Sequence, residues 1–183
     1  MMRAWHLIPE KQMAIGAAAK CGSTSLRKVI QGSEELGCSI DQERVPETAI
    51  PKGYTRIGIV RHPVARYYSL WNNVQERPRS RQNYYAQFEG KDPEEMLDGI
   101  LRVGLDHDVH TQPQYLIGLE KATALVRLEN LGAWWEKVMG TEFPHRNASK
   151  GLAMYNSQDS LSKRVLGVYP TDYTFWEEAD AGS

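Results

Sequence analysis

The stretch AAAKCGSTSLRKVI, residues 17–30, restricts the fold of this chain more than any other part of the sequence. It begins at the end of an apolar run, residues 11–19, that is typical of a buried strand. It ends with apolar side chains at Leu26, Val29 and Ile30, a spacing that predicts a helix. Between the two lies a short loop with a lysine, a glycine and three hydroxyl residues. A strand that passes through a tight loop into a helix is the basic unit of α/β proteins, so this stretch predicts a domain of that class.

The rest of the chain continues to alternate between strand and helix patterns. The apolar run at residues 57–60 predicts a buried strand, and Pro63 begins the helical pattern that follows it. Residues 92–104 predict a helix with Asp92 as its N-cap and a closing glycine. The remaining predictions are a strand over residues 122–131, a short helix over residues 133–140, and two closing helices over residues 157–169 and 170–179. This order predicts an α/β three-layer sandwich, with helices on both faces of a central, mainly parallel sheet.

The length and the two ends of the sequence suggest a single domain. The chain has 183 residues, which suits one compact domain, and residues 1–11 and 178–183 are expected to be loose ends. The beginning lacks the apolar core of a secretory signal, and no apolar run approaches the roughly 20 residues of a membrane span. We therefore expect a cytoplasmic protein without a membrane span, in which Cys21 and Cys38 are free thiols.

The charges of the chain are balanced. There are 22 lysines and arginines against 23 acidic residues, and the net charge is −1. This balance provides no overall basic field to attract nucleic acid, and we expect no nucleic-acid partner. Any binding site for an anion has to be built locally from a few residues.

The loop at residues 20–25 combines the groups that bind an anion. A helix N-terminus presents N–H groups and the positive end of a dipole, and Gly22 lets the backbone approach a bound group closely. Lys20 adds a positive charge, and Ser23, Thr24 and Ser25 add hydroxyl donors. The Walker phosphate loop, however, has its lysine directly after the glycine, where this chain has Ser23. This difference, and the lack of a clear magnesium ligand, argue against transfer of a γ-phosphoryl group.

Several segments in order resemble the sulfotransferases that use 3′-phosphoadenosine 5′-phosphosulfate (PAPS). AKCGSTSL, residues 19–26, resembles their 5′-phosphosulfate loop, with Ala19 where proline is common. VRHPVARYYSLW, residues 60–71, resembles their 3′-phosphate segment through a pattern of four residues: Arg61, Pro63, Arg66 and Ser69. The later segments DVHTQPQYL, VRLENL, PHRNAS and YPTDYTFW resemble the carbohydrate (type 2) branch in the same order.

The resemblance implies a P-loop nucleotide-kinase-like sulfotransferase fold and a PAPS-dependent enzyme. Such an enzyme moves a sulfuryl group to a hydroxyl or amine of a carbohydrate or other small acceptor, requires no metal, and releases adenosine 3′,5′-bisphosphate (PAP). The donor-binding residues that it implies are Lys20, Cys21, Gly22, Ser23, Thr24, Ser25, Arg61 and Ser69. It further suggests that Asn147, Ser149 and Lys150 contact the nucleotide or the acceptor, although a capped turn explains these three residues equally well.

A sulfotransferase is helped by a base that takes the proton of the acceptor, and histidine is the usual choice near neutral pH. His110 is the first candidate, because the resembling family has a histidine in this segment and Asp108 is placed to orient it. In several better-known sulfotransferases the base lies between the two donor motifs, where this chain has no histidine. Glu43 is therefore the second candidate, with Asp41 and Glu47 as the other acids of that segment.

Other interpretations remain open at this point. A P-loop kinase acting on a small molecule would need a lysine after the glycine, and a non-catalytic adenine-nucleotide-binding protein would need no base. Arg66 is more simply explained by an ion pair that holds the fold, and Ser69 by a buried helix hydroxyl. His107 and His110 have the spacing of metal ligands, but no cluster with a third ligand is evident. The oligomeric state and the acceptor do not follow from the sequence.

Overall fold

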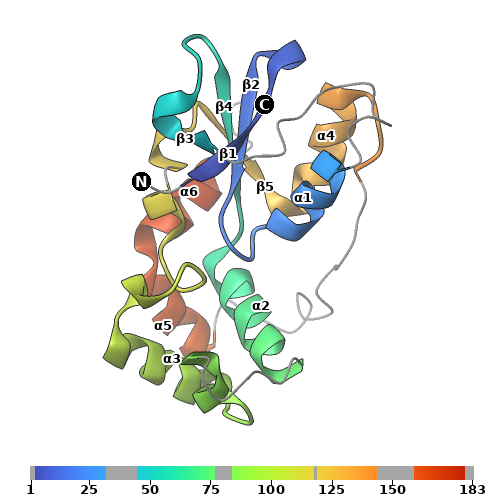
Figure 1. The fold of residues 1–183 in the computed structure, drawn as a ribbon. Coiled ribbons are helices and arrows are strands. Elements are labelled where there is room, and N and C mark those ends of the chain that lie inside the picture. Colours follow the sequence, from blue (N-terminus) through green and yellow to red (C-terminus); the bar gives the residue numbers. More distant parts are fainter. Residues whose placement is uncertain (1–2, 32–44, 77–83, 118, 144–158, 180–183) are drawn as a thin grey trace.

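The computed structural model describes residues 3–31, 45–76, 84–117, 119–143 and 159–179 (Figure 1). Its strands are β1 (Arg3–Ile8), β2 (Met13–Ala17), β3 (Val45–Pro46), β4 (Thr55–Val60) and β5 (Ala124–Arg127). Its α-helices are α1 (Ser23–Gln31), α2 (Pro63–Glu76), α3 (Pro93–Val103), α4 (Leu131–Met139), α5 (Ser160–Val168) and α6 (Pro170–Glu178). Short 3-10 segments connect several of these elements, among them η4 (Tyr84–Phe88) and η6 (Gln114–Ile117).

The strands form one mixed sheet in the order β3-β1-β2-β4-β5. β2, β4 and β5 are parallel neighbours, and Ile57 of β4 lies between Ile15 and Ala124 in the register. β1 is antiparallel to both β2 and β3. The predicted α/β class is confirmed. The sheet is parallel from β2 to β5 and antiparallel from β2 to β3. The carboxyl ends of the three parallel strands meet at one edge, which is where open α/β sheets bind ligands.

The first strand corrects the expectation that residues 1–11 are a loose end. Arg3–Ile8 pairs with strands on both sides, and Trp5 is 1% exposed. Trp5 lies opposite Gly16 of β2, where an added Cβ would lie 3.0 Å from the indole ring. Glycine therefore provides the space that this tryptophan fills, and the N-terminal segment is part of the core.

The opposite end of the chain is also more ordered than expected. Helix α6 continues to Glu178, and Ala179 is 2% exposed. Residues 178 and 179 therefore do not belong to a loose end, as was expected for residues 178–183. Residues 180–183 lie outside the described part of the chain, as do residues 1–2.

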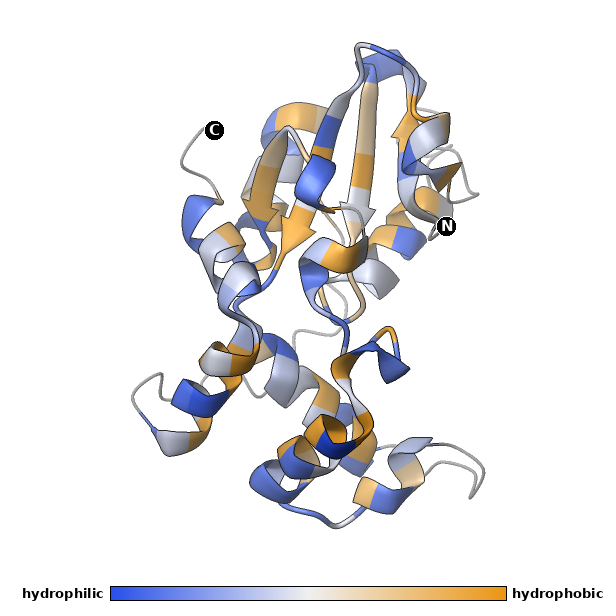
Figure 2. Ribbon diagram, turned by 90° about the vertical axis from the view of Figure 1, so that its left-hand side faces the viewer, coloured by the Kyte–Doolittle hydropathy of each residue, from blue (hydrophilic) through white to orange (hydrophobic). Residues whose placement is uncertain are grey.

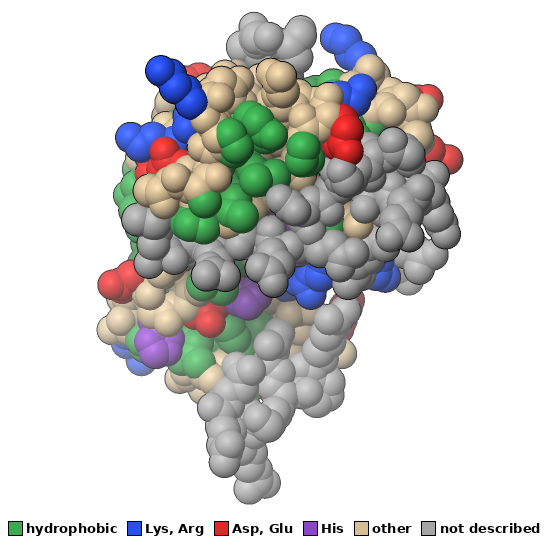
Figure 3. All heavy atoms as spheres, turned by 45° about the horizontal axis from the view of Figure 1, so that its top comes forward, with side chains coloured by type: hydrophobic (Ala, Val, Ile, Leu, Met, Phe, Trp, Pro, Cys, Tyr) green, Lys and Arg blue, Asp and Glu red, His purple; other side chains and the backbone are tan. Residues whose placement is uncertain are grey.

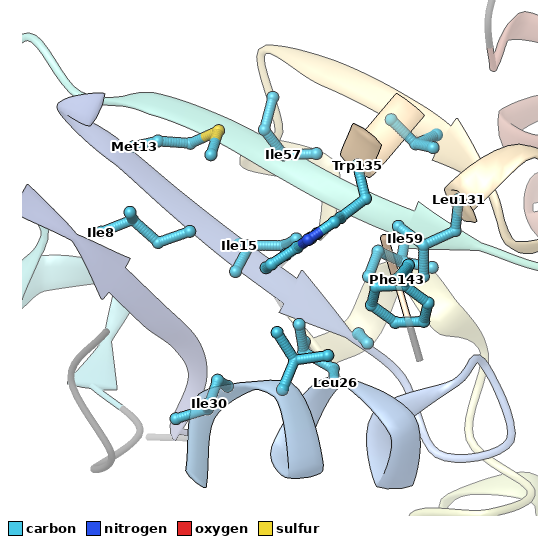
Figure 4. Packing of buried hydrophobic residues seen from close by; sticks show 13 residues of the cluster. Ile8, Met13, Ile15, Leu26, Ile30, Ile57, Ile59, Leu131, Trp135 and Phe143 are labelled. Carbon is cyan, nitrogen blue, oxygen red and sulfur yellow. The ribbon is translucent and has the colours of Figure 1, made fainter. Parts of the chain in front are cut away.

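Helices α1 and α4 cover one face of the sheet (Figures 1 and 4). Side chains alternate between the two faces along a strand, so Met13 and Ile15 of β2 point to the same side. Leu26 and Ile30 of α1 and Trp135 of α4 pack against this side, all of them buried. The helix predicted from the spacing of its apolar residues thus lies directly beside the strand that precedes it.

Helix α6 covers the other face of the sheet. Ala14 and Ala18 point to this side and belong to a second cluster, which Phe175 and Trp176 of α6 join. Arg127, at the end of β5, holds the helix: its Nε donates to the carbonyl of Trp176 at 3.0 Å. Its guanidinium carbon also lies 4.2 Å from the centre of the Trp176 ring. The sheet therefore has helices on both faces.

Three further helices, α2, α3 and α5, form a helical lobe beyond the carboxyl edge of the sheet (Figures 1 and 2). The apolar faces of these helices and of η4 meet in a third cluster, separate from the clusters of the sheet. The predicted N-cap of α3 is confirmed: Asp92 accepts from the N–H of Glu95 at 2.8 Å, and the Glu95 side chain accepts from the N–H of Asp92. The candidate site lies where this lobe meets the sheet.

Candidate functional site

The loop between β2 and α1 has an unusual backbone. Lys20 and Gly22 have φ angles of 67° and 78°, in the left-handed region. Glycine adopts this region freely, whereas a lysine there is strained. A Cβ added to Gly22 would lie only 2.6 Å from the Cδ1 of Leu128, so a side chain at this position would also crowd the residue that follows β5. The two left-handed residues turn the chain sharply, and α1 begins directly afterwards at Ser23.

Two buried arginines hold the carbonyl groups of this loop. The Nη1 of Arg61 donates to the carbonyl of Lys20 at 3.0 Å, and the Nε of Arg66 donates to the carbonyl of Ala19 at 3.0 Å. Each arginine is only 3% exposed. The Nη2 of Arg66 is buried and has no hydrogen-bond partner in the described part of the chain. The loop therefore lies beside two positive charges, and the Nη2 of Arg66 lacks an acceptor among the described residues.

Gln114, at the start of η6, joins the loop to the residue after β4. Its Oε1 accepts from the N–H of Arg61 at 2.9 Å and from the Sγ of Cys21 at 2.9 Å. Its Nε2 donates to the carbonyl of Arg61, also at 2.9 Å. Burial raises the pKa of the Cys21 thiol to about 12, so the thiol stays protonated near neutral pH and acts as a donor. The side chain of Cys21 therefore serves the structure of the loop.

Asp172 of α6 accepts hydrogen bonds from the backbone N–H of Gln114. Its two carboxylate oxygens lie 2.7 and 2.8 Å from the N–H of Gln114, and it forms an ion pair with Arg66 at 3.8 Å. This pair agrees with the structural role expected for Arg66. Burial raises the pKa of Asp172, against the lowering effect of the bond from Gln114 and of the Arg66 charge. The carboxylate of Asp172 thus contacts both Gln114 and Arg66, the two residues through which it supports the loop.

His110 lies in the turn that follows the short 3-10 segment Leu105–His107. Its Nδ1 is 2.6 Å from the Oδ1 of Asp108, and its backbone N–H donates to the same oxygen at 2.8 Å. The hydroxyl of Tyr85 also donates to this oxygen, at 2.8 Å. Because an ionised carboxylate only accepts hydrogen bonds, Nδ1 carries the proton and the Nε2 of the neutral ring carries the lone pair.

The burial of this histidine favours its neutral form. Burial lowers the pKa of His110, Asp108 raises it, and the positive charges of Lys20 and Arg66 lower it further. Burial alone would raise the pKa of Asp108, but the bonds from His110 and Tyr85 outweigh it, and that pKa lies below its usual value. The ring therefore combines the protonation state and the tautomer that a base needs, and it lies within the electrostatic range of the loop.

The structure brings some of the predicted residues together. Lys20 and Arg61 are joined directly, Cys21 is joined to Arg61 through Gln114, and His110 feels the charge of Lys20. In the space-filling view, basic and histidine side chains gather where the sheet meets the helical lobe (Figure 3). Ser23, Thr24 and Ser25 form the first turn of α1, where N–H groups have no acceptor within the helix.

Other predicted residues are not joined to the site. Ser69 lies in the middle of α2, partly exposed, and no contact connects it with the loop. Glu47 begins a short 3-10 segment after β3. Glu43 and Asp41, and the predicted contacts Asn147, Ser149 and Lys150, lie outside the described residues, as does Cys38.

Three residues of the site, Gln114, Asp172 and Tyr85, were not among the predicted site residues, although the first two lie in segments that carry the resemblance. Gln114 and Asp172 come from segments 53 and 58 residues apart from their main partners, so only the folded chain brings them in. Asp172 is in the first turn of a helix, where an acidic residue is common without any further role. Tyr85 lies in η4, and its contact with Asp108 depends on how η4 packs against the turn that carries His110.

We compared the chain with protein-family models, with curated proteins and with solved structures, and none of them matches. Within the ranges that the structure describes, no three histidine, cysteine or acidic side chains are grouped so that they could hold a metal ion. Among the same residues, no helix has the length and apolar character needed to cross a membrane.

The arrangement is chemically suited to an anion with more than one charged group. A helix N-terminus, Lys20 and the unpartnered Nη2 of Arg66 offer donors of positive character at the carboxyl edge of the sheet. His110 offers a lone pair nearby. The site can therefore bind negative charge and accept a proton in the same region.

Proposed function

We propose that this chain is a PAPS-dependent sulfotransferase with a P-loop nucleotide-kinase-like fold. It moves a sulfuryl group from PAPS to a hydroxyl or amine of a carbohydrate or other small acceptor and releases PAP. The proposal extends the resemblance of the two donor motifs to the site described above. The observation that carries it is the contact between these motifs: Arg61 and Arg66 both bind carbonyl groups of the loop before α1.

The donor residues fit the charge of this ligand. PAPS, when bound, supplies an activated sulfuryl group on a 5′-phosphate and carries a second phosphate at the 3′ position. Lys20 and the N–H groups at the start of α1 would hold the phosphosulfate end, and Arg61 would hold the 3′-phosphate. The Nη2 of Arg66 is buried and has no hydrogen-bond partner among the described residues, and a buried guanidinium N–H without an acceptor is costly.

The protein's own contribution to the reaction is positioning and charge. Sulfuryl transfer, like phosphoryl transfer, leaves little covalent work to the protein, so it depends on alignment and on neutralising charge at the leaving group. Lys20 supplies that positive charge. His110 takes the proton of the acceptor at Nε2, while Asp108 keeps the proton on Nδ1 and holds the ring.

A test of binding separates this proposal from its two alternatives. PAP should raise the melting temperature of the protein, since a ligand held at about 100 times its Kd stabilises the folded state by about 2.7 kcal/mol. ATP with magnesium should do so only weakly, because the loop lacks the lysine position of a kinase. Equal stabilisation by both ligands, or by ATP alone, would contradict the proposal and favour a kinase.

A transfer assay then separates an enzyme from a binding protein. Labelled PAPS is offered with a panel of hydroxyl and amine acceptors, and transfer of label to at least one of them is expected. Stabilisation by PAP without transfer to any acceptor would favour a non-catalytic nucleotide-binding protein. Transfer to one class of acceptor would also identify the substrate.

A further inference from the structure

Gln114 makes several buried hydrogen bonds at the carboxyl edge of the sheet. The side chain is 0% exposed and bonds to both backbone groups of Arg61 and to the thiol of Cys21. Its own backbone N–H is bound by Asp172. Every one of these groups is buried, so the bonds form in a medium of low dielectric, where they are strong and where losing one leaves a polar group unsatisfied.

The place of Gln114 in the sheet explains what these bonds do. The register between β4 and β5 ends with Val60 opposite Arg127, so Arg61 is the first residue of this strand beyond that pairing. The carboxamide of Gln114 gives the N–H and the carbonyl of Arg61 the two partners that a neighbouring strand would have supplied. The hydrogen bonding of the sheet therefore continues for one residue beyond β4, to Arg61, two residues before α2 begins.

The same carboxamide also fixes the loop. Its Oε1 is shared between the N–H of Arg61 and the thiol of Cys21, so one oxygen atom connects the two donor motifs. Arg61 reaches the loop a second time through Lys20. The distance between the loop and Arg61 is thus set by contacts at both ends of the arginine, from its backbone and from its guanidinium.

We propose that Gln114 is a positioning residue that fixes the spacing between the loop at residues 20–25 and Arg61, and so selects a nucleotide with phosphates at both the 5′ and the 3′ positions. This inference rests on the proposed function. A ligand with two phosphate groups gains from both subsites only where their separation matches its own, and that gain is lost when one subsite moves.

The experiment compares the affinities of PAP and adenosine 5′-phosphate, measured by calorimetry. The wild-type protein should prefer PAP by about tenfold or more, since the second phosphate adds charge-assisted hydrogen bonds. Gln114→Met keeps much of the volume but removes the bonds to Arg61 and Cys21. The preference for PAP should fall by about tenfold, while the affinity for adenosine 5′-phosphate changes less.

A matched control distinguishes this effect from a general loss of stability. Gln75 also clamps the backbone through its carboxamide, with bonds to Phe88, Gly90 and Lys91 in the helical lobe. Gln75→Met should lower the melting temperature without changing the ratio of the two affinities. A ratio that fell equally in both variants would assign Gln114 a role in stability alone.

A second pair of variants tests the same connection where Gln114→Met does not fold. Cys21→Ser keeps a donor to Gln114 and should keep the preference for PAP, whereas Cys21→Ala removes the donor and should lower it by a few fold. An unchanged preference in Gln114→Met overturns the inference, and so does an unchanged preference in Cys21→Ala where Gln114→Met does not fold. Absence of any preference in the wild-type protein would instead count against the proposed function itself.

Discussion

The candidate site has a buried side, formed by Arg61 and Gln114, and a half-exposed side, formed by His110 and Asp108. Arg61 and Gln114 are 3% and 0% exposed, and the two hydrogen bonds that join them are buried. The side chains of His110 and Asp108 are 36% and 31% exposed, and they lie in a turn instead of a regular element. The buried side is fixed by several elements at once: β4, η6 and α6 all contribute. The exposed side depends mainly on one carboxylate.

This difference separates what each side can do. Buried hydrogen bonds fix positions closely, because any movement leaves a polar group without its partner. A half-exposed histidine keeps access to solvent and to a second molecule while its ring is still oriented by Asp108. On the proposed function, the buried side would be preorganised for the donor and the exposed side would receive the acceptor.

Replacing the base should have the largest effect on turnover. In His110→Ala, kcat measured at saturating PAPS should fall about 1,000-fold, the middle of the range for a positioned general base. His107→Ala is the control, since this exposed ring contacts Tyr84 and not Asp108. Glu43→Ala is measured in parallel: full rate in His110→Ala together with a loss in Glu43→Ala would move the base to Glu43.

Removing the charge of the loop should have the next largest effect. Lys20→Ala should lower turnover on the order of 100-fold, which is the scale for loss of one preorganised donor. Lys28→Ala, an exposed lysine of α1, should leave it unchanged. Thermal unfolding checks that both variants are folded, and turnover at the wild-type level in Lys20→Ala would remove this residue from the mechanism.

The carboxylate beside the base should have a smaller effect, with a characteristic pH dependence. The pKa of His110 is lowered by burial and by Lys20 and Arg66, so the acidic limb of kcat/KM should lie below pH 6.5. Asp108→Asn should lower the rate about tenfold, the factor for one hydrogen bond to a charged group. Because Asp108 raises the pKa of His110, its loss should move the limb to still lower pH. A limb that moved to higher pH would contradict this arrangement.

The smallest effect is expected from Tyr85. Tyr85→Phe removes one hydrogen bond to Asp108 and should lower turnover about threefold. The tautomer of His110 should persist, which nitrogen NMR of the ring can detect as a proton on Nδ1. Loss of that proton in Tyr85→Phe would mean that Asp108 alone does not orient the ring.

The sequence was sufficient for the elements whose signals are local. The loop and helix at residues 20–31, the capping box of Asp92 and the strand β4 all follow from neighbouring residues. Strand β1 was missed because RAWHLI lacks a clear alternation of polar and apolar residues, and its burial depends on β2 and β3. Gln114 and Asp172 also depend on distant parts of the chain, because the partners of a buried polar residue are known only from the folded structure.

The left-handed backbone of Lys20 has a consequence for the design of variants. Glycine would favour this conformation, and an L-residue there costs about 1–2 kcal/mol, so Lys20 lowers the folding stability relative to glycine at this turn. Lys20→Gly and Lys20→Ala both delete the amino group, but only glycine also relieves the backbone. A protein that melts higher as Lys20→Gly than as wild type, yet turns over no faster than Lys20→Ala, would show stability and activity in direct opposition at a single residue.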